Sequence, residues 1–221
     1  MILGSLRTTS YGRFFRAVQV GAVVLGLGAA PAMAKTLHVV ALGDSLTAGY
    51  GLPPGQSFPD VLQRVLRQKG YDVEIANAGV SGDTAEDGLA RFDWSVPQGA
   101  DALIVELGAN DMLQGRPPEA AKAALAAILD KAKAAKLKVL VAGIRAAPNL
   151  GTDYQRKFDP IFADLAKTYG ADLYPFFLDG VAADPKLNQH DGLHPTREGV
   201  EKIVAAILPA TERLLAEASK P

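Results

Sequence analysis

The order of its apolar segments is the feature that most constrains how this chain can fold. From Thr36 onward, short runs rich in β-branched residues alternate with longer segments of helical periodicity. This order is typical of a parallel sheet covered by helices on both faces. Strands are predicted at residues 36–42, 72–76, 101–107 and 138–143, with a shorter fifth strand around Leu173. The sequence therefore predicts a three-layer α/β/α fold, flavodoxin-like, with a central, mostly parallel five-stranded sheet.

Helices are expected in the intervening segments. Ser57 is a predicted N-cap of a helix that ends at Gly70, and further helices are predicted at residues 118–135 and 153–169 and in the amphipathic run that includes Val200. Of the 221 residues, 48% are hydrophobic and 21% are charged, which suits one globular domain with a substantial core.

The first 34 residues differ in kind from the rest of the chain. They contain three arginines and no acidic residue, and residues 20–30 form an apolar run. Residues 31–34, Pro-Ala-Met-Ala, have the small-residue spacing of a secretory cleavage site. The alternative is an uncleaved membrane anchor, but the apolar run is shorter than the roughly 20 residues that a bilayer span requires. We therefore expect a signal peptide at residues 1–34 and a single mature domain at residues 35–221.

Cleavage before Lys35 implies export, to the periplasm or outside the cell, with no stable membrane anchor afterwards. It also lowers the formal net charge from −1 to −4, because three arginines are lost. This net negative charge argues against nucleic acid as a partner. The chain has no cysteine, which excludes a thiol nucleophile and any disulfide.

Three predicted strands are each followed by a turn sequence that carries polar residues. These turns comprise residues 43–45, 79–82 and 108–111. The carboxyl ends of parallel strands form the ligand-binding edge of an open sheet, so the three turns should converge on one site.

Ser45, in the first of these turns, is a candidate nucleophile if a base lies within hydrogen-bond reach. That base is normally a histidine oriented by a carboxylate. His38 lies inside the first strand, at the end away from Ser45, and is expected to be structural. Asp191 and His194 form a natural pair just before the last helix, although Asp-Gly and His-Pro dipeptides also suit an ordinary polar turn.

Four sequence blocks resemble those of the GDSL, or SGNH, hydrolase family. The blocks are Gly43-Asp44-Ser45-Leu46 after the first strand, residues 77–84 (NAGVSGDT), residues 108–111 (GAND) and residues 191–194 (DGLH). Their order and spacing fit the family across nearly the whole mature chain. Within it, the sequence is similar to bacterial periplasmic enzymes described as multifunctional acyl thioesterase, arylesterase and lysophospholipase. One departure is Ala109, where those relatives carry a second glycine.

The resemblance implies the SGNH hydrolase fold and a catalytic triad of Ser45, Asp191 and His194. It also implies an oxyanion hole made by the backbone N–H groups of Ser45 and Gly82 and the side-chain amide of Asn110. The expected substrates are small-molecule esters, thioesters or lysophospholipids, and no cofactor or metal is required. A carbohydrate O-acetylesterase on the same fold is the closest alternative.

Two alternatives belong to other classes of protein. His190 and His194 have the spacing of a zinc-binding His-x-x-x-His helix, but Gly192 and Pro195 disfavour a helix there. A noncatalytic binding module is the other alternative. The Gly-x-Ser-x-Gly elbow of ordinary α/β-hydrolases is absent, since Thr47 stands where its last glycine belongs.

Other polar and apolar residues are expected near the predicted site. Asp44 and Asp111 are expected to organise their loops, and Arg145 to be a solvated loop residue. Five apolar side chains fit either an acyl pocket or the core: Tyr50, Leu113, Ile144, Pro148 and Phe176.

Overall fold

A five-stranded sheet, parallel throughout, forms the centre of the computed structural model, which describes residues 1, 2, 4 and 35–220. The strand order is β2-β1-β3-β4-β5, and every neighbouring pair is parallel. The strands are β1 (Leu37–Gly43), β2 (Val73–Gly79), β3 (Ala102–Glu106), β4 (Lys138–Ala142) and β5 (Asp172–Tyr174). The predicted signal peptide at residues 1–34 lies almost entirely outside the described residues.

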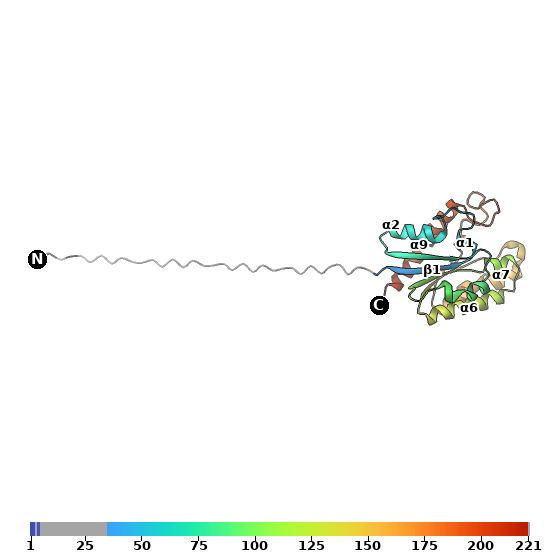
Figure 1. The fold of residues 1–221 in the computed structure, drawn as a ribbon, viewed down its shortest axis with the longest axis horizontal. Helices are drawn as coiled ribbons and strands as arrows, with labels where there is room; N and C mark the ends of the chain where they lie inside the picture. The colour runs from blue at the N-terminus through green and yellow to red at the C-terminus, as the bar shows by residue number, and fades with distance from the viewer. Residues whose placement is uncertain (3, 5–34, 221) are drawn as a thin grey trace. The chain divides into compact units, whose positions relative to one another are not determined.

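Helices cover both faces of this sheet, as Figure 1 shows with α2 and α9 on one side and α6 on the other. Their bounds are α1 (Ser45–Ala48), α2 (Phe58–Gln68), α3 (Ala85–Ala90), α4 (Phe92–Ser95), α5 (Ala109–Leu113), α6 (Pro118–Ala134), α7 (Thr152–Phe158), α8 (Pro160–Tyr169) and α9 (Arg197–Ala218), with a 3-10 turn η1 at Pro148–Leu150. The predicted three-layer fold is confirmed. None of the described helices is both long and apolar enough to cross a membrane.

The five strands lie close to their predicted positions, but one predicted helical segment is divided. Residues 153–169 form two helices, α7 and α8, which meet at Asp159 and Pro160. A proline lacks the N–H that would continue the preceding helix, so a new helix begins there instead.

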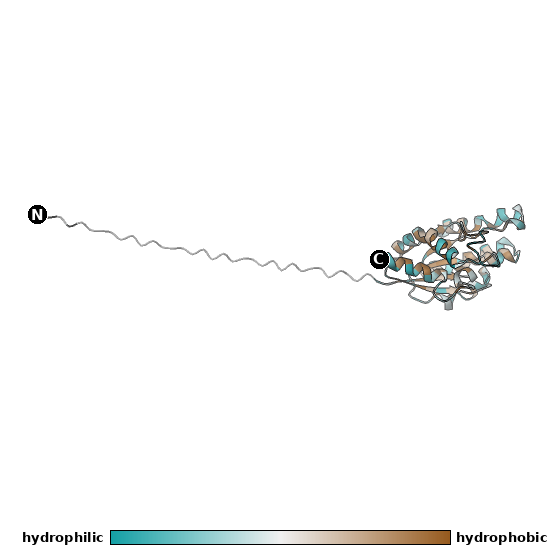
Figure 2. Ribbon diagram, turned by 90° about the horizontal axis from the view of Figure 1, so that it is seen from above, coloured by the Kyte–Doolittle hydropathy of each residue, from teal (hydrophilic) through white to brown (hydrophobic). Residues whose placement is uncertain are grey.

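The start of α2 follows from its sequence. The Ser57 hydroxyl accepts the backbone N–H of Asp60, and the Asp60 carboxylate accepts the N–H of Ser57, so two otherwise unpaired groups are satisfied. The helix buries Phe58, Leu62 and Leu66 completely. Brown and teal alternate along the helices in Figure 2, as expected of elements that bury one side only.

The central strands β1 and β3 are almost completely buried in the core. All five residues of β3 are buried, and only His38 is exposed in β1. His38 lies 3.3 Å from the Glu74 carboxylate in β2, at the end of the strand away from Ser45. The strands are therefore fixed by burial on both faces, and their carboxyl ends are held at one edge of the sheet.

Candidate active site

Ser45 lies where β1 ends and the short helix α1 begins. The Asp44 carboxylate accepts the backbone N–H of Leu46 and so caps the start of α1. The chain turns sharply at Gly43, where an added Cβ would lie 2.0 Å from the Thr47 hydroxyl oxygen and 2.7 Å from the Glu106 carbonyl oxygen. Only glycine fits this close approach, which places Ser45 at the carboxyl edge of the sheet.

The imidazole of His194 connects Ser45 and Asp191. Its Nε2 lies 2.9 Å from the Ser45 Oγ, and its Nδ1 lies 2.6 Å from an Asp191 carboxylate oxygen. A carboxylate can only accept a hydrogen bond, so Nδ1 carries the hydrogen and Nε2 presents a lone pair to the hydroxyl. The arrangement is therefore that of a general base oriented to activate a serine.

Asp191 is held as a carboxylate by its own loop. Besides Nδ1, it accepts the backbone N–H of His194 at 3.0 Å and that of Leu193 at 2.9 Å. The His194 N–H, the His194 side chain and the Leu193 N–H together lower the pKa of Asp191 from 3.8 to about 2. The group that faces the imidazole therefore remains charged at neutral pH.

A side chain that the sequence analysis missed, Gln189, fastens this loop to the rest of the site. Its Nε2 donates to the Tyr50 carbonyl at 2.7 Å and to the Pro195 carbonyl at 2.9 Å, and its backbone N–H donates to the His194 carbonyl at 2.7 Å. The one available signal was its position two residues before Asp191. Its partner Tyr50 is 139 residues away in the chain.

The two other predicted oxyanion-hole residues reach the same place. Gly82, after β2, has a φ of +92° that suits glycine, and Asn110 lies in the first turn of α5. Both line one cavity with Ser45 and His194. The Asn110 amide is already engaged, because its Nδ2 donates to the Asp83 carbonyl at 2.9 Å and to an Asp44 carboxylate oxygen at 3.1 Å.

The cavity above Ser45 has a volume of about 740 Å³ and mostly apolar walls. Five apolar side chains were predicted to lie either in an acyl pocket or in the core. All five line this cavity: Tyr50, Leu113, Ile144, Pro148 and Phe176. Arg145 also lies at its wall, with its guanidinium 5.1 Å from the centre of the Phe176 ring, while remaining exposed. A volume of this size and polarity suits an acyl or aryl group.

The remaining polar features are arranged differently from a metal site. Residues 190–194 form turns and bends, so His190 and His194 do not share a helix face. Within residues 35–220, no group of three or more acidic or histidine side chains is arranged as a set of metal ligands.

A second cavity, of about 640 Å³, lies around His38, Arg67 and Glu74 at the opposite end of the strands. None of the predicted site residues lines it.

The parallel sheet, with a serine, a histidine and an aspartate joined at its carboxyl edge, defines the class of protein as a hydrolase of the SGNH fold. Residues 41–202 match the model of the GDSL-like Lipase/Acylhydrolase family, and the chain belongs to this family.

Two curated relatives and one solved structure illustrate the likeness. Esterase TesA of Pseudomonas aeruginosa is 38% identical over 196 residues, which cover 88% of this chain and 96% of the relative. Thioesterase 1/protease 1/lysophospholipase L1 of Escherichia coli is 38% identical over 168 residues, or 76% and 78% of the two chains. The crystal structure of AlinE4, an SGNH-hydrolase family esterase, is 46% identical with a TM-score of 0.69 and covers 83% of this chain and 98% of that one. The protein is therefore an ester-bond hydrolase.

Proposed function

We propose that the protein is an exported serine esterase that hydrolyses carboxylic esters and acyl thioesters through an acyl-serine intermediate. The observation that carries this proposal is the unbroken chain of hydrogen bonds from Asp191 through His194 to Ser45, which opens onto an apolar cavity. Ser45, His194 and Asp191 are the proposed nucleophile, general base and orienting carboxylate.

In the first half of the reaction, the Ser45 Oγ attacks the acyl carbonyl carbon and its proton passes to Nε2 of His194. The negative charge on the carbonyl oxygen is stabilised by the N–H groups of Ser45 and Gly82 and by the Asn110 amide. Removal of one such donor typically costs about 3 to 4 kcal/mol of transition-state stabilisation. The bond to the alcohol or thiol then breaks, and the imidazolium returns the proton to the leaving group.

In the second half, water replaces the leaving group. His194 takes a proton from the water as its oxygen attacks the acyl carbon, and the same proton then goes to Ser45 as the carboxylic acid departs. These groups complete both halves without a cofactor. Asp191 keeps Nδ1 protonated throughout, so that Nε2 alone exchanges the proton.

The cavity supports a substrate with an apolar acyl or aryl part. Its walls carry aromatic and aliphatic side chains, among them Tyr50, Leu113 and Phe176. The relatives are named as an esterase and as a thioesterase and lysophospholipase, which agrees with that chemistry. We propose aryl esters, acyl thioesters and lysophospholipids as the substrate classes.

The proposal of export rests on residues 1–34. Expression of the full chain in a Gram-negative host should give a periplasmic or secreted protein whose first residue is Lys35. Mass spectrometry of the purified N-terminus measures this. A protein that retains residues 1–34 and stays in the cytoplasm would exclude export.

The activity is tested on p-nitrophenyl esters from acetate to palmitate, with the mature chain and its Ser45→Ala variant. Ser45-dependent turnover that rises toward medium or long acyl chains is expected. Turnover confined to acetate would favour a carbohydrate O-acetylesterase instead. Equal turnover by the Ser45→Ala variant would remove Ser45 from its role, provided that the variant has the same thermal unfolding midpoint as the wild type.

A further inference from the structure

Asp44 lies between the proposed nucleophile and the proposed oxyanion donor and uses both of its carboxylate oxygens. One oxygen accepts the backbone N–H of Leu46 at 2.9 Å, and the other accepts the side-chain amide of Asn110 at 3.1 Å. The Asp44 side chain is fully buried. A single carboxylate therefore bridges the turn that carries Ser45 and the helix that carries Asn110. Asp44 and Asn110 are 66 residues apart in the chain.

The bond from Asn110 to Asp44 decides how the amide is oriented. An amide nitrogen has two hydrogens, and the second acceptor is the Asp83 carbonyl oxygen at 2.9 Å. With both acceptors in place, the plane of the amide is set before a substrate arrives, and one of the two hydrogens is then shared with the oxyanion when that charge forms. If Asp44 stopped accepting, the Asp83 carbonyl alone would leave the amide free to turn about its last bond.

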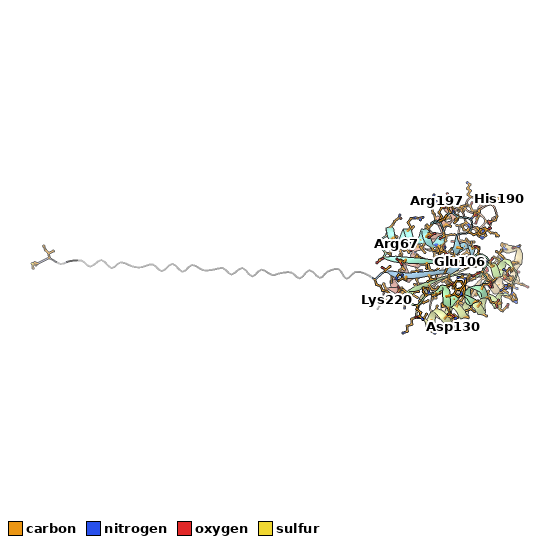
Figure 3. The ribbon with its side chains drawn as sticks, in the orientation of Figure 1. Arg67, Glu106, Asp130, His190, Arg197 and Lys220 are labelled. Carbon is orange, nitrogen blue, oxygen red and sulfur yellow. The ribbon has the colours of Figure 1, made fainter. Side chains whose placement is uncertain are left out.

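The surroundings of Asp44 are unusual for a residue that only caps a helix. Directly beneath α1, Glu106 of β3 is fully buried and accepts the Thr47 hydroxyl at 2.7 Å. Figure 3 shows Glu106 within the body of the sheet. The helix α1 that Asp44 caps has only four residues.

Burial also gives this carboxylate an uncommon protonation behaviour. Desolvation, with smaller contributions from the charges of Asp83 and Asp111, raises the pKa of Asp44 to about 7, although the Leu46 N–H and His194 act to lower it. Burial likewise raises the pKa of Glu106 well above its ordinary range, with the charge of Asp44 adding to the effect.

We infer that Asp44 is a positioning residue, which ties the Ser45 turn to the Asn110 amide and so sets the geometry of the oxyanion donor. This inference rests on the proposed esterase function. Asp44 borders the cavity but its side chain is fully buried, and it acts through the Asn110 amide. A residue of this kind should affect kcat far more than KM, because the oxyanion forms only in the transition state.

The test is a double-mutant cycle with Asp44→Asn and Asn110→Ala, measured as kcat and KM on p-nitrophenyl butyrate. An asparagine at position 44 has one oxygen, so it can satisfy Leu46 or Asn110 but not both. We expect Asn110→Ala to lower kcat about 100-fold or more, as for other oxyanion donors, and Asp44→Asn to lower it about 10- to 100-fold. KM should change less than about twofold, and the double variant should be no slower than Asn110→Ala alone, within about threefold.

The matched control is Asp111→Asn. Asp111 is also a buried acid in this region and accepts the backbone N–H of Ala85 at 2.8 Å, with no bond to the Asn110 amide. Asp111→Asn removes a buried carboxylate without removing a hydrogen bond of the Asn110 amide, so its loss should combine with that of Asn110→Ala closer to a product than the loss from Asp44→Asn does. If the losses from Asp44→Asn and Asn110→Ala also multiply, or if Asp44→Asn leaves kcat unchanged, the inference is wrong.

A second measurement uses no Asp44 variant, so it tests the inference even if Asp44→Asn does not fold. In NMR spectra of the wild-type protein, the Asn110 side-chain amide is identified by its absence from the Asn110→Ala spectrum. Its shift should follow the titration of the Asp44 carboxyl carbon, while the His194 ring is followed separately by its own carbon-bound proton. If the chemical shift of the Asn110 amide does not change as Asp44 titrates, the inference is wrong.

Failure of this inference and failure of the proposed function are distinguishable. Without Ser45-dependent turnover by the wild-type enzyme, the esterase proposal itself fails. With normal wild-type turnover and independent Asp44 and Asn110 effects, only the positioning role is lost.

Discussion

The phenol ring of Tyr50 packs on the imidazole of His194, with ring centroids 4.5 Å apart and ring planes inclined at 37°. Tyr50 is 53% exposed and lines the cavity, so it covers one side of the proposed general base. The imidazole becomes a cation during the proposed reaction, and the face of an aromatic ring within about 6 Å stabilises a cation. The contact therefore favours the charged state in which His194 holds the Ser45 proton.

Replacement of Tyr50 should show whether its ring or its hydroxyl matters. We expect Tyr50→Leu to lower kcat/KM roughly two- to fivefold, corresponding to about 0.5–1 kcal/mol for an exposed cation–π contact. Tyr50→Phe keeps the ring face and should remain close to wild type. Steady-state kinetics of both variants on p-nitrophenyl butyrate measure this, and equal losses in both would show that the ring is not responsible.

The charge of Asp191 should matter for both activity and pH-dependent stability. Asp191→Asn places an amide against Nδ1 of His194, and we expect kcat to fall about 10³- to 10⁴-fold, as in other serine triads. Turnover within threefold of wild type would remove Asp191 from its proposed role.

The same substitution has a predictable effect on unfolding. Because the folded-state pKa of Asp191 is lowered from 3.8 to about 2, its carboxylate stabilises the fold fully above its unfolded pKa, and this contribution disappears as the pH falls through 2. Urea unfolding of wild type and Asp191→Asn should therefore differ at pH 7 and converge at the lowest pH at which both still fold. A difference that grows on acidification would contradict the lowered pKa.

Gln189 should support the position of the histidine loop. Gln189→Leu keeps the approximate size but removes the donors to the Tyr50 and Pro195 carbonyls. We expect kcat/KM to fall about three- to tenfold and the unfolding midpoint to fall by about 2–6 °C, since the two carbonyls lose their partner. Gln98→Leu, at an exposed position outside the site, is the control and should change neither quantity by a comparable amount.

Gly43 should tolerate no side chain. The Cβ of Gly43→Ala would lie 2.0 Å from the Thr47 hydroxyl oxygen and 2.7 Å from the Glu106 carbonyl oxygen, so β1 and α1 would have to separate. We expect a loss of about 3 kcal/mol or more in the free energy of unfolding, measured by urea denaturation.

The matched control for this change is Gly55→Ala. Gly55 has a φ of +81° and no atom within 4 Å of an added Cβ, so it tests backbone strain alone. That strain costs about 1–2 kcal/mol. Gly43 does not have a positive φ, so this strain is absent there, and a loss below about 1 kcal/mol in Gly43→Ala would show that the added Cβ is accommodated.

The sequence alone was sufficient for the sheet because the signals for strands and helices are local. Runs of β-branched residues predicted four of the strands and a short apolar run around Leu173 predicted the fifth, and the structure places all five within a few residues of the expected bounds. The division of residues 153–169 into α7 and α8 was also a local matter, since Pro160 marks it, but the prediction joined the two because both halves share helical periodicity.

The candidate site was partly accessible for a related reason. In a parallel sheet all strands end at one edge, so the loops with Ser45, Gly82 and Asn110 could be expected to meet, and the structure brings them to one cavity. Which apolar side chains would line that cavity stayed open. Tyr50, Leu113 and Phe176 are residue types that occur equally well in a core. Only the packing of the loops decides whether they line the cavity or lie in the core.

The pairing of polar groups across long stretches of chain depends on the tertiary fold. The sequence determined the order of strands and helices, the glycine turn before Ser45 and the short Asp191-to-His194 loop, because each depends on neighbours in the chain. The bonds from Gln189 to the Tyr50 carbonyl and from Asn110 to Asp44 span 139 and 66 residues. A hydrogen bond requires its atoms to lie within a few tenths of an ångström of the ideal distance, and no periodicity in the sequence specifies where two distant loops will stop.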